Sequence, residues 1–368
     1  MLVEGPEKKT VSSAVATFAD ISVSAQDVVN CSYSQWYNKF SSYTYTKAEI
    51  LRPVPIEFIN YLLSDDIILP KDEQGSSLFQ KVELNSDNEY SDWEEEEDDD
   101  ADADADEDKD LSNKASPTST FPSFHQKIKD AIQRLGGKVA PKLNWTSPQD
   151  ATWMMMNNTM ECHNATELYL LLKSSDYINH DIGHAFECVT EGPQNVPEGF
   201  EYELVLRKWF DINPSMEFRC FVRDRQLIAI SPRDLNYYTF MKDFENEIVD
   251  KIDLFFDSVL LPKFDSNSFA FDVYIPKPLT TVYLVDVNPF ARQTDSLLFS
   301  WNELATMKSD DDGPLFRKVE QANSGRFASR AHSQNQVPKE IVDASLDTEA
   351  LVELAQGWDK MMKKEDGD

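Results

Sequence analysis

Apolar residues recur at helical spacing in four stretches of the chain. These stretches are 55–64, 121–137, 165–174 and 241–261. Residues three and four positions apart share one side of a helix, so each pattern predicts an amphipathic helix that buries that side. The second stretch ends at Gly136 and Gly137, and consecutive glycines are typical of a helix terminus.

Strand-like segments, rich in β-branched and aromatic residues, follow the second helix. They cover residues 138–145, 202–210, 217–231, 268–275 and 281–290. The third segment is long enough to fold back on itself, with a turn at Asp224 and Arg225. The last two are joined by a proline-containing turn at 276–280, which predicts a second hairpin. The pattern predicts an α+β fold, with antiparallel sheets flanked by helices.

Composition and charge narrow the function classes. The chain has 368 residues, of which 41% are hydrophobic, and its net charge is -31. A chain this acidic lacks the basic surface that nucleic acid requires, so we expect no direct nucleic-acid partner. No run approaches the roughly 20 apolar residues of a membrane span, and the first residues do not resemble a secretory signal. We therefore expect a cytoplasmic protein with no membrane contact. We also expect a monomer.

One internal tract carries about half of the net charge. Between Asp87 and Asp110 there are 16 acidic residues and one lysine. Such a block repels itself and has almost nothing to bury, which predicts a disordered insertion at 86–120 within the fold.

The most informative chemistry lies in the second predicted hairpin. Asp286 and Asn288 are two positions apart and so share one face of a strand. If Asp272 pairs with Asp286, so that paired residue numbers sum to 558, three oxygen-bearing side chains meet on that face. Facing carboxylates repel, so this arrangement favours a cation, and oxygen ligands favour Mg2+. The alternative is a solvated polar face, and a register shift of one residue would separate the side chains.

Basic residues on the neighbouring predicted strands strengthen the first interpretation. They are Lys142, Arg207, Lys208, Arg219 and Arg233. Each basic residue taken alone is better explained as a solvated strand position or a weak surface ion pair. Taken together beside an acidic triad, they suit a polyphosphate with its metal ion. The sequence contains neither GxxxxGK[ST] nor GxGxxG, which excludes a P-loop or Rossmann binding mode. Trp145 and Trp209 each lie near one of these basic residues and are candidates for a base pocket.

Several of these segments together resemble the cell division cycle protein 123 family. The segments, in chain order, are CSYSQWY, FPSFHQKIKDAIQRLGGKVAPKLNWTSPQDATW, YELVLRKW, EFRCFV, FAFDVYI and VDVNPF. They span about residues 28–304 apart from the insertion. The resemblance implies an ATP-grasp fold, in which two α+β subdomains clasp ATP. It also implies ATP-dependent assembly of eukaryotic translation initiation factor 2, through binding of its gamma subunit and promotion of its joining to the alpha subunit.

The resemblance also implies a domain organisation. We expect a flexible N-terminus at 1–27, an N-terminal subdomain at 28–85 and 121–200, a C-terminal subdomain at 201–304, and a partner-binding tail at 305–368 with a final helix within 343–364.

Individual roles follow from matching positions in the family pattern. Lys142 matches a phosphate-binding lysine, and Asn144 and Trp145 flank it in the nucleotide cleft. The resemblance places three residues on the strand beside the base, two as phosphate or ribose contacts, and three as Mg2+ ligands. The residues beside the base are Arg207, Lys208 and Trp209, and the phosphate or ribose contacts are Arg219 and Arg233. The Mg2+ ligands are Asp272, Asp286 and Asn288. Val287 stands where the family commonly has an aromatic residue, but its side chain is expected on the opposite face from Asp286.

Two function classes are compatible with these features. An assembly chaperone would bind ATP and Mg2+ to hold a shape that its partner recognises. An ATP-grasp ligase would form an acyl phosphate and would need a pocket for a carboxylate substrate, for which the sequence gives no sign. The acidic insertion and the long tail favour the chaperone.

Overall fold

The computed structural model describes residues 20–70, 116–193, 195–307 and 313–320. The acidic tract at 87–110, the N-terminal stretch up to residue 19 and the helix expected within 343–364 lie outside these described residues. The expected insertion extended to residue 120, but Pro117–Ser119 forms a 3-10 turn in which Thr118 is buried. The described residues form two compact units, each with its own sheet.

The first unit contains residues 32–70, 116–185 and 197–211. Its sheet has the antiparallel strand order β1-β3-β2. Its elements are α2 (Tyr33–Phe40), β1 (Ala48–Leu51), α3 (Ile56–Leu63), α5 (Pro122–Arg134), β2 (Val139–Lys142), α6 (Ala165–Lys173), α7 (Asp176–Gly183) and β3 (Leu204–Lys208), with 3-10 turns at Ser41–Tyr43 and Gln149–Met154. We expected β3 in the C-terminal part of the fold, but its pairing with β1 and β2 places it here.

Helix α5 forms where the apolar spacing predicts it. Pro122 begins the helix at a position where its missing N–H is not needed, and Phe124, Ile128 and Ile132 are buried. The main-chain N–H of Gly137 donates to the carbonyl of Ile132 at 2.8 Å, which closes the helix end. The helices expected near α3 and α6 are confirmed as well.

The two faces of the three-stranded sheet differ in character. Val139, Leu204 and Leu206 belong to one apolar core together with residues of α3, α5, α6 and α7. Lys142 pairs with Val205, and because residues alternate between faces, Lys142 points away from that core. Arg207, two residues from Val205, shares the face of Lys142.

The second unit contains residues 20–31, 186–193, 195–196, 212–307 and 313–320. Its sheet has the strand order β7-β6-β4-β5-β8. Its elements are α1 (Ala25–Asn30), β4 (Glu217–Arg223), β5 (Gln226–Pro232), α8 (Met241–Phe255), β6 (Phe269–Tyr274), β7 (Tyr283–Pro289), α9 (Trp301–Thr306) and β8 (Leu315–Phe316), with a 3-10 turn at Pro214–Met216 and a π-helical turn at Phe256–Leu260 after α8. Strand β8 joins the sheet edge in parallel and was not expected from the sequence.

Both predicted hairpins are confirmed. Strands β4 and β5 pair antiparallel, and the turn residues Asp224 and Arg225 have φ values of 52° and 63°. Two consecutive positive φ values produce the tight turn that matches strand twist. Strands β6 and β7 also pair antiparallel. The α+β class with antiparallel sheets flanked by helices is therefore confirmed.

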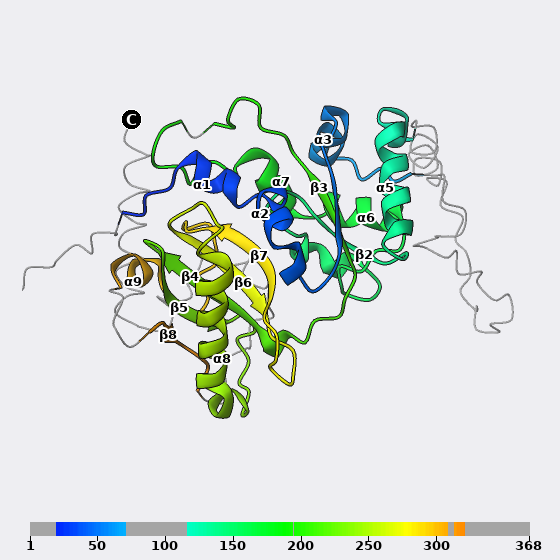
Figure 1. Ribbon diagram of the computed structural model, residues 1–368. Helices are drawn as coiled ribbons and strands as arrows, with labels where there is room; N and C mark the ends of the chain where they lie inside the picture. The colour runs from blue at the N-terminus through cyan, green and yellow to red at the C-terminus, as the bar shows by residue number, and fades with distance from the viewer. Residues whose placement is uncertain (1–19, 71–115, 194, 308–312, 321–368) are drawn as a thin grey trace, which may run out of the picture. The chain divides into compact units, whose positions relative to one another are not determined.

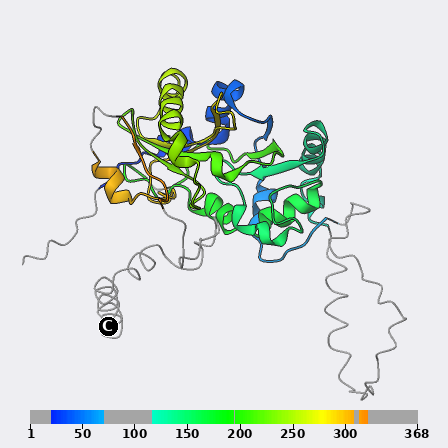
Figure 2. The same cartoon turned by 90° about the horizontal axis from the view of Figure 1, so that it is seen from below.

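Helices cover both faces of the five-stranded sheet. Phe256, directly after α8, stacks on Phe271 of β6 with ring centroids 6.1 Å apart. Trp301 of α9 meets Phe221 of β4 edge to face at 6.0 Å. Phe221 and Phe271 lie on opposite faces, because Phe221 pairs with Ala270. Figure 1 shows α8 in front of this sheet, and Figure 2 shows α8 and α9 on its two sides. Among the described residues, no helix has the length and apolarity to cross a membrane.

Candidate functional site: an acid and arginine cluster on the five-stranded sheet

The register of β6 and β7 brings the predicted acidic residues together. Asp272 pairs with Asp286, and Ala270 pairs with Asn288, so paired numbers sum to 558 as the triad requires. Cross-strand partners share a face, so Asp272, Asp286 and Asn288 lie on the same side of the sheet. Val287 is fully buried on the other side, as expected.

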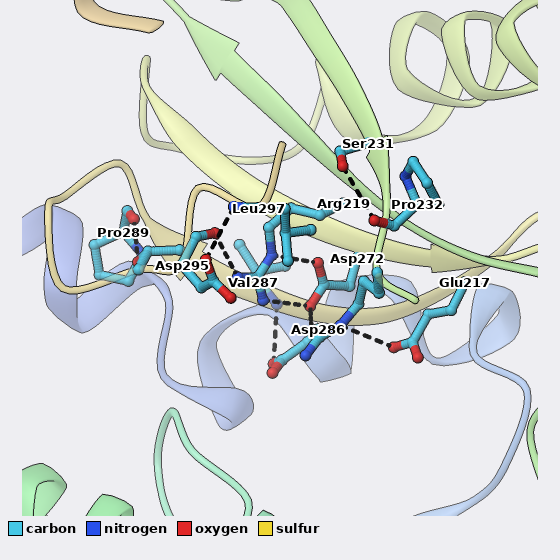
Figure 3. A network of polar contacts seen from close by, with 12 residues as sticks. Glu217, Arg219, Ser231, Pro232, Asp272, Asp286, Val287, Pro289, Asp295 and Leu297 are labelled. Atoms are coloured by element: carbon cyan, nitrogen blue, oxygen red, sulfur yellow. Dashed lines mark hydrogen bonds and ion pairs between the residues drawn. The ribbon is translucent and has the colours of Figure 1, made fainter. Parts of the chain in front are cut away.

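Asp272 accepts hydrogen bonds from two arginines. Figure 3 shows it beside Arg219 in this network of polar contacts. The side chain of Asp272 is 0% exposed. Arg219 of β4 donates from Nε to Oδ1 at 2.8 Å and from Nη2 to Oδ2 at 2.9 Å. Arg233, just after β5, donates from Nη1 to the same Oδ2. Asp272 of β6 is therefore bonded to β4 and to the residue that follows β5. We call Asp272, Asp286, Arg219, Arg233 and Glu217 the acid–arginine cluster.

Neighbouring charges shift the pKa values of Asp272 and Arg233. Burial alone would raise the pKa of Asp272, but the guanidinium groups of Arg219 and Arg233 outweigh it and lower the pKa to about 2. Burial likewise lowers the pKa of Arg233, and the carboxylates around it raise that pKa above its usual value. Those carboxylates belong to Asp272, Glu217 and Asp286. At neutral pH Asp272 and Arg233 are therefore both charged.

Asp286 and Asn288 carry the side-chain oxygen atoms best suited to bind a cation. Both side chains are half-buried. Asp286 Oδ1 accepts a hydrogen bond from the N–H of Val287 at 3.0 Å, which orients the carboxylate. The described residues include no group of three His, Cys, Asp or Glu side chains able to hold a metal. A cation here would take carboxylate and amide oxygens from Asp286 and Asn288 and its remaining oxygens from a ligand, which fits Mg2+ bound with a polyphosphate.

The two arginines of the cluster are not equivalent. Besides its two bonds to Asp272, Arg219 donates from Nη1 to the main-chain carbonyl of Asp295 at 2.8 Å. Its side chain is 7% exposed, whereas that of Arg233 is 23% exposed. Arg219 is thus used inside the protein, and Arg233 is the arginine that a ligand can reach.

The other predicted residues lie in the first unit, on its three-stranded sheet or directly after its strands. Lys142 is 0% exposed, and its Nζ donates to the main-chain carbonyl of Trp145. Asn144 Oδ1 accepts from the N–H of Glu203 at 3.1 Å. The ring of Trp145 stacks on Phe200 with centroids 5.5 Å apart. These contacts tie the segment after β2 to Glu203 and Phe200.

The end of β3 divides its predicted residues between two faces. Arg207 shares a face with Lys142 and donates from Nη2 to Ser147 Oγ at 3.2 Å. Lys208 pairs with Val139 and therefore lies on the opposite face, where it is exposed. Trp209 is half-buried, and its main-chain N–H donates to Lys138 at 2.8 Å.

Sequence reasoning missed several residues of these networks. Glu217 lies two positions before Arg219 and shares its face, and its carboxylate is 3.7 Å from Nε of Arg233. The period of two on β4 was a signal that could have found it. Asp295 contributes through its main chain, and no sequence pattern indicates such a contact.

Fold and site define an α+β protein of two sheet-containing units, one of which carries a buried acid–arginine cluster. A sequence model of the D123 family matches residues 36–345, so the chain belongs to that family.

Similar proteins agree with this assignment. A "Translation initiation factor eIF2 assembly protein" of Kluyveromyces lactis is 46% identical over 352 residues, covering 95% of this chain and 96% of that protein. A "Cell division cycle protein 123" of Candida glabrata is 42% identical over 362 residues, covering 97% of this chain and 98% of that protein. The solved structure of C-terminally truncated Cdc123 from Schizosaccharomyces pombe matches with a TM-score of 0.64 and 34% identity, covering 82% of this chain and all of that one. The resemblance found in the sequence is confirmed.

Proposed function

We propose that this protein is an ATP- and Mg2+-binding assembly factor for eukaryotic translation initiation factor 2. It binds the gamma subunit and promotes its joining to the alpha subunit, and so supports translation initiation and cell-cycle progression. Support comes from family membership and from relatives whose names state eIF2 assembly or cell division. The ATP-grasp fold implied by the resemblance belongs to this proposal, as does action in the cytoplasm as a monomer.

The pairing of Asp272 with Asp286 beside two arginines is the observation that carries the nucleotide proposal. Asp286 and Asn288 hold Mg2+, and Arg233 pairs with a phosphate oxygen. Asp272, the third metal ligand expected from the sequence, accepts hydrogen bonds from Arg219 and Arg233 at its two carboxylate oxygens, so it would join the metal ligands only by exchanging one of these bonds. Bound Mg2+ supplies positive charge between the phosphates and the carboxylates. When ATP binds, its phosphate oxygens take over part of the charge compensation that the Asp272 carboxylate provides to the Arg233 guanidinium.

Lys142 of the first unit is proposed as a phosphate ligand, and Arg207 lies on the same face of its sheet. In the described structure the ammonium of Lys142 is occupied by the Trp145 carbonyl, so phosphate binding requires that hydrogen bond to be exchanged. Asn144 and Trp145 shape the segment beside it. Lys208 and Trp209 are proposed to act beside the base.

Calorimetric titration of ATP into the purified protein, with and without Mg2+, tests the nucleotide site. We expect binding that depends on Mg2+ and is lost in Asp286→Ala. Asp224→Ala, which removes an exposed carboxylate from the β4–β5 turn, is the matched control and should bind normally. Equal ATP binding by wild type and Asp286→Ala would refute the metal site.

A separate experiment tests the assembly role. Purified gamma subunit is mixed with wild-type protein or Asp286→Ala, and alpha subunit is added. We expect a complex with gamma and faster appearance of gamma–alpha pairs with the wild type. Stoichiometric conversion of ATP into a ligated small-molecule product would instead identify a ligase.

A further inference from the structure

The turn that follows β2 determines where the Lys142 ammonium lies. The N–H of Leu143 donates to the carbonyl of Thr146 at 3.0 Å and closes the turn. Lys142 Nζ donates to the carbonyl of Trp145, which lies inside that turn. A shift of the turn would therefore move the ammonium with it.

Asp181 of α7 holds this turn from the outside. Its Oδ2 accepts the main-chain N–H of Thr146 at 2.8 Å, and its Oδ1 accepts the Thr146 hydroxyl at 2.7 Å. The side chain is 4% exposed. Both carboxylate oxygens thus accept hydrogen bonds from Thr146, and Asp181 also has a hydrogen bond to the main chain of Trp145, so the carboxylate fixes the turn relative to α7.

The buried ammonium of Lys142 also needs negative charge nearby, because an unpaired buried charge is costly. Among the described residues, Asp181 and Glu203 are buried acids whose charges interact with that of Lys142. Burial raises the pKa of Asp181, and the Thr146 hydroxyl and the charge of Lys142 oppose that rise. Glu203 accepts the N–H of Ser34 at 2.8 Å and is tied to α2, whereas Asp181 is tied to the turn itself.

We propose that Asp181 is a positioning residue for Lys142. It holds the 143–146 turn through Thr146, and its carboxylate is the main counter-charge of the Lys142 ammonium. The positioning is a property of this unit alone, whereas its use in phosphate binding rests on the proposed function. Helix α7 thereby becomes part of the machinery that presents Lys142.

Amine labelling followed by mass spectrometry tests this proposal without any nucleotide. The chain offers an internal control in Lys173, which is also buried and whose Nζ donates to the carbonyls of Tyr61 and Ser64 at 2.5 and 2.8 Å. In Asp181→Asn we expect Lys142 to be labelled on the order of tenfold faster than in wild type, because a charge-assisted contact is lost. Lys173 should keep its wild-type rate.

Three results would overturn the proposal. The first is an unchanged Lys142 rate in Asp181→Asn, and the second is a larger increase in Glu203→Gln, which would make Glu203 the counter-charge. If Asp181→Asn exposes Lys142 and Lys173 together, the milder Thr146→Val decides. That variant removes the hydroxyl donor and keeps the Asp181 carboxylate, so the labelling rate of Lys142 alone should rise. A higher labelling rate for both lysines, or for neither, would be the third contradicting result.

Titration with Mg2+ and ATP then separates this proposal from the proposed function. We expect Asp181→Asn to weaken ATP binding, but less than Lys142→Met does, because the ammonium is still present. Faster labelling of Lys142 with unchanged ATP affinity in both variants would leave the positioning role intact. That outcome would remove Lys142 from the phosphate site.

Discussion

Arg219 donates two hydrogen bonds to Asp272, at 2.8 and 2.9 Å, and both side chains are almost completely buried. A buried carboxylate in this setting is stable only while its cationic partners remain. Arg219 adds a third bond to the carbonyl of Asp295. One guanidinium thus connects β4, β6 and the segment after β7, and the candidate site depends on that connection.

Replacing Arg219 with lysine should destabilise the protein. Lysine keeps the charge but cannot make two parallel bonds to Asp272 and a third to Asp295. We expect the free energy of unfolding, measured in urea, to fall by roughly 2 kcal/mol. The control is Arg134→Lys, since Arg134 pairs with Glu49 on the surface and should tolerate the change. Equal losses in both variants would contradict the special position of Arg219.

Asp272 should make the protein sensitive to acid. Its folded pKa of about 2 lies below the ordinary value of 3.8. The stability from this group is therefore complete above pH 3.8 and is lost as the pH falls through 2. The shift corresponds to roughly 2 kcal/mol.

Asp272→Asn tests this acid sensitivity by urea unfolding at pH 5 and pH 2. The variant is less stable than wild type at pH 5, because it leaves two arginines without their carboxylate, but the difference should shrink at pH 2. Asp224→Asn changes an exposed carboxylate and should follow the wild type at both pH values. A difference that stays constant with pH would disprove the assignment.

The local elements were predictable from sequence, and the roles within the cluster were not. Helix α5 and the β4–β5 hairpin depend on residues a few positions apart, so spacing and turn chemistry suffice. A shift of one residue between β6 and β7 would have separated Asp272 from Asp286. The observed register instead pairs them and places apolar Val287 on the opposite, buried face. The difference in exposure between Arg219 and Arg233 depends on the side chains packed around them, and the spacing of residues along a strand does not reveal it.

Long-range pairing explains the other differences between sequence and structure. The domain organisation implied by the resemblance placed β3 with the C-terminal strands, yet its partners are β1, which begins at Ala48, and β2, which begins at Val139. β8 has only two residues, Leu315 and Phe316, too few for a periodic signal. The hydrogen bonds that Thr146 donates to Asp181 join residues 35 positions apart.

Asp181 should give the protein the opposite pH dependence to Asp272. Burial raises its pKa from 3.8 to about 6, against the opposing effects of the Thr146 hydroxyl and Lys142. The stability from this group is therefore complete below pH 3.8 and is lost as the pH rises through 6. The loss amounts to roughly 3 kcal/mol, and urea unfolding at pH 4 and pH 7 measures it.

Asp181→Asn removes this titration, so the stability of the variant should fall less than that of wild type between pH 4 and pH 7. Asp211→Asn, at an exposed position of the same unit, should behave as wild type. Parallel curves for wild type and Asp181→Asn would contradict the prediction. A carboxylate that costs stability at neutral pH yet holds the turn beside Lys142 fits a residue kept for positioning.

Arg233 should affect nucleotide binding more than Arg219 does, relative to its effect on stability. Its side chain is 23% exposed, and only one of its nitrogen atoms, Nη1, donates to Asp272. We expect Arg233→Gln to weaken Mg2+-dependent ATP binding about tenfold in calorimetry, since one charge-assisted phosphate contact is lost. The control is Arg225→Gln in the β4–β5 turn, which removes the same charge from the same unit and should bind ATP as wild type does. If both variants weaken binding equally, the arginines contribute only general electrostatic attraction, and the direct phosphate contact of Arg233 is wrong.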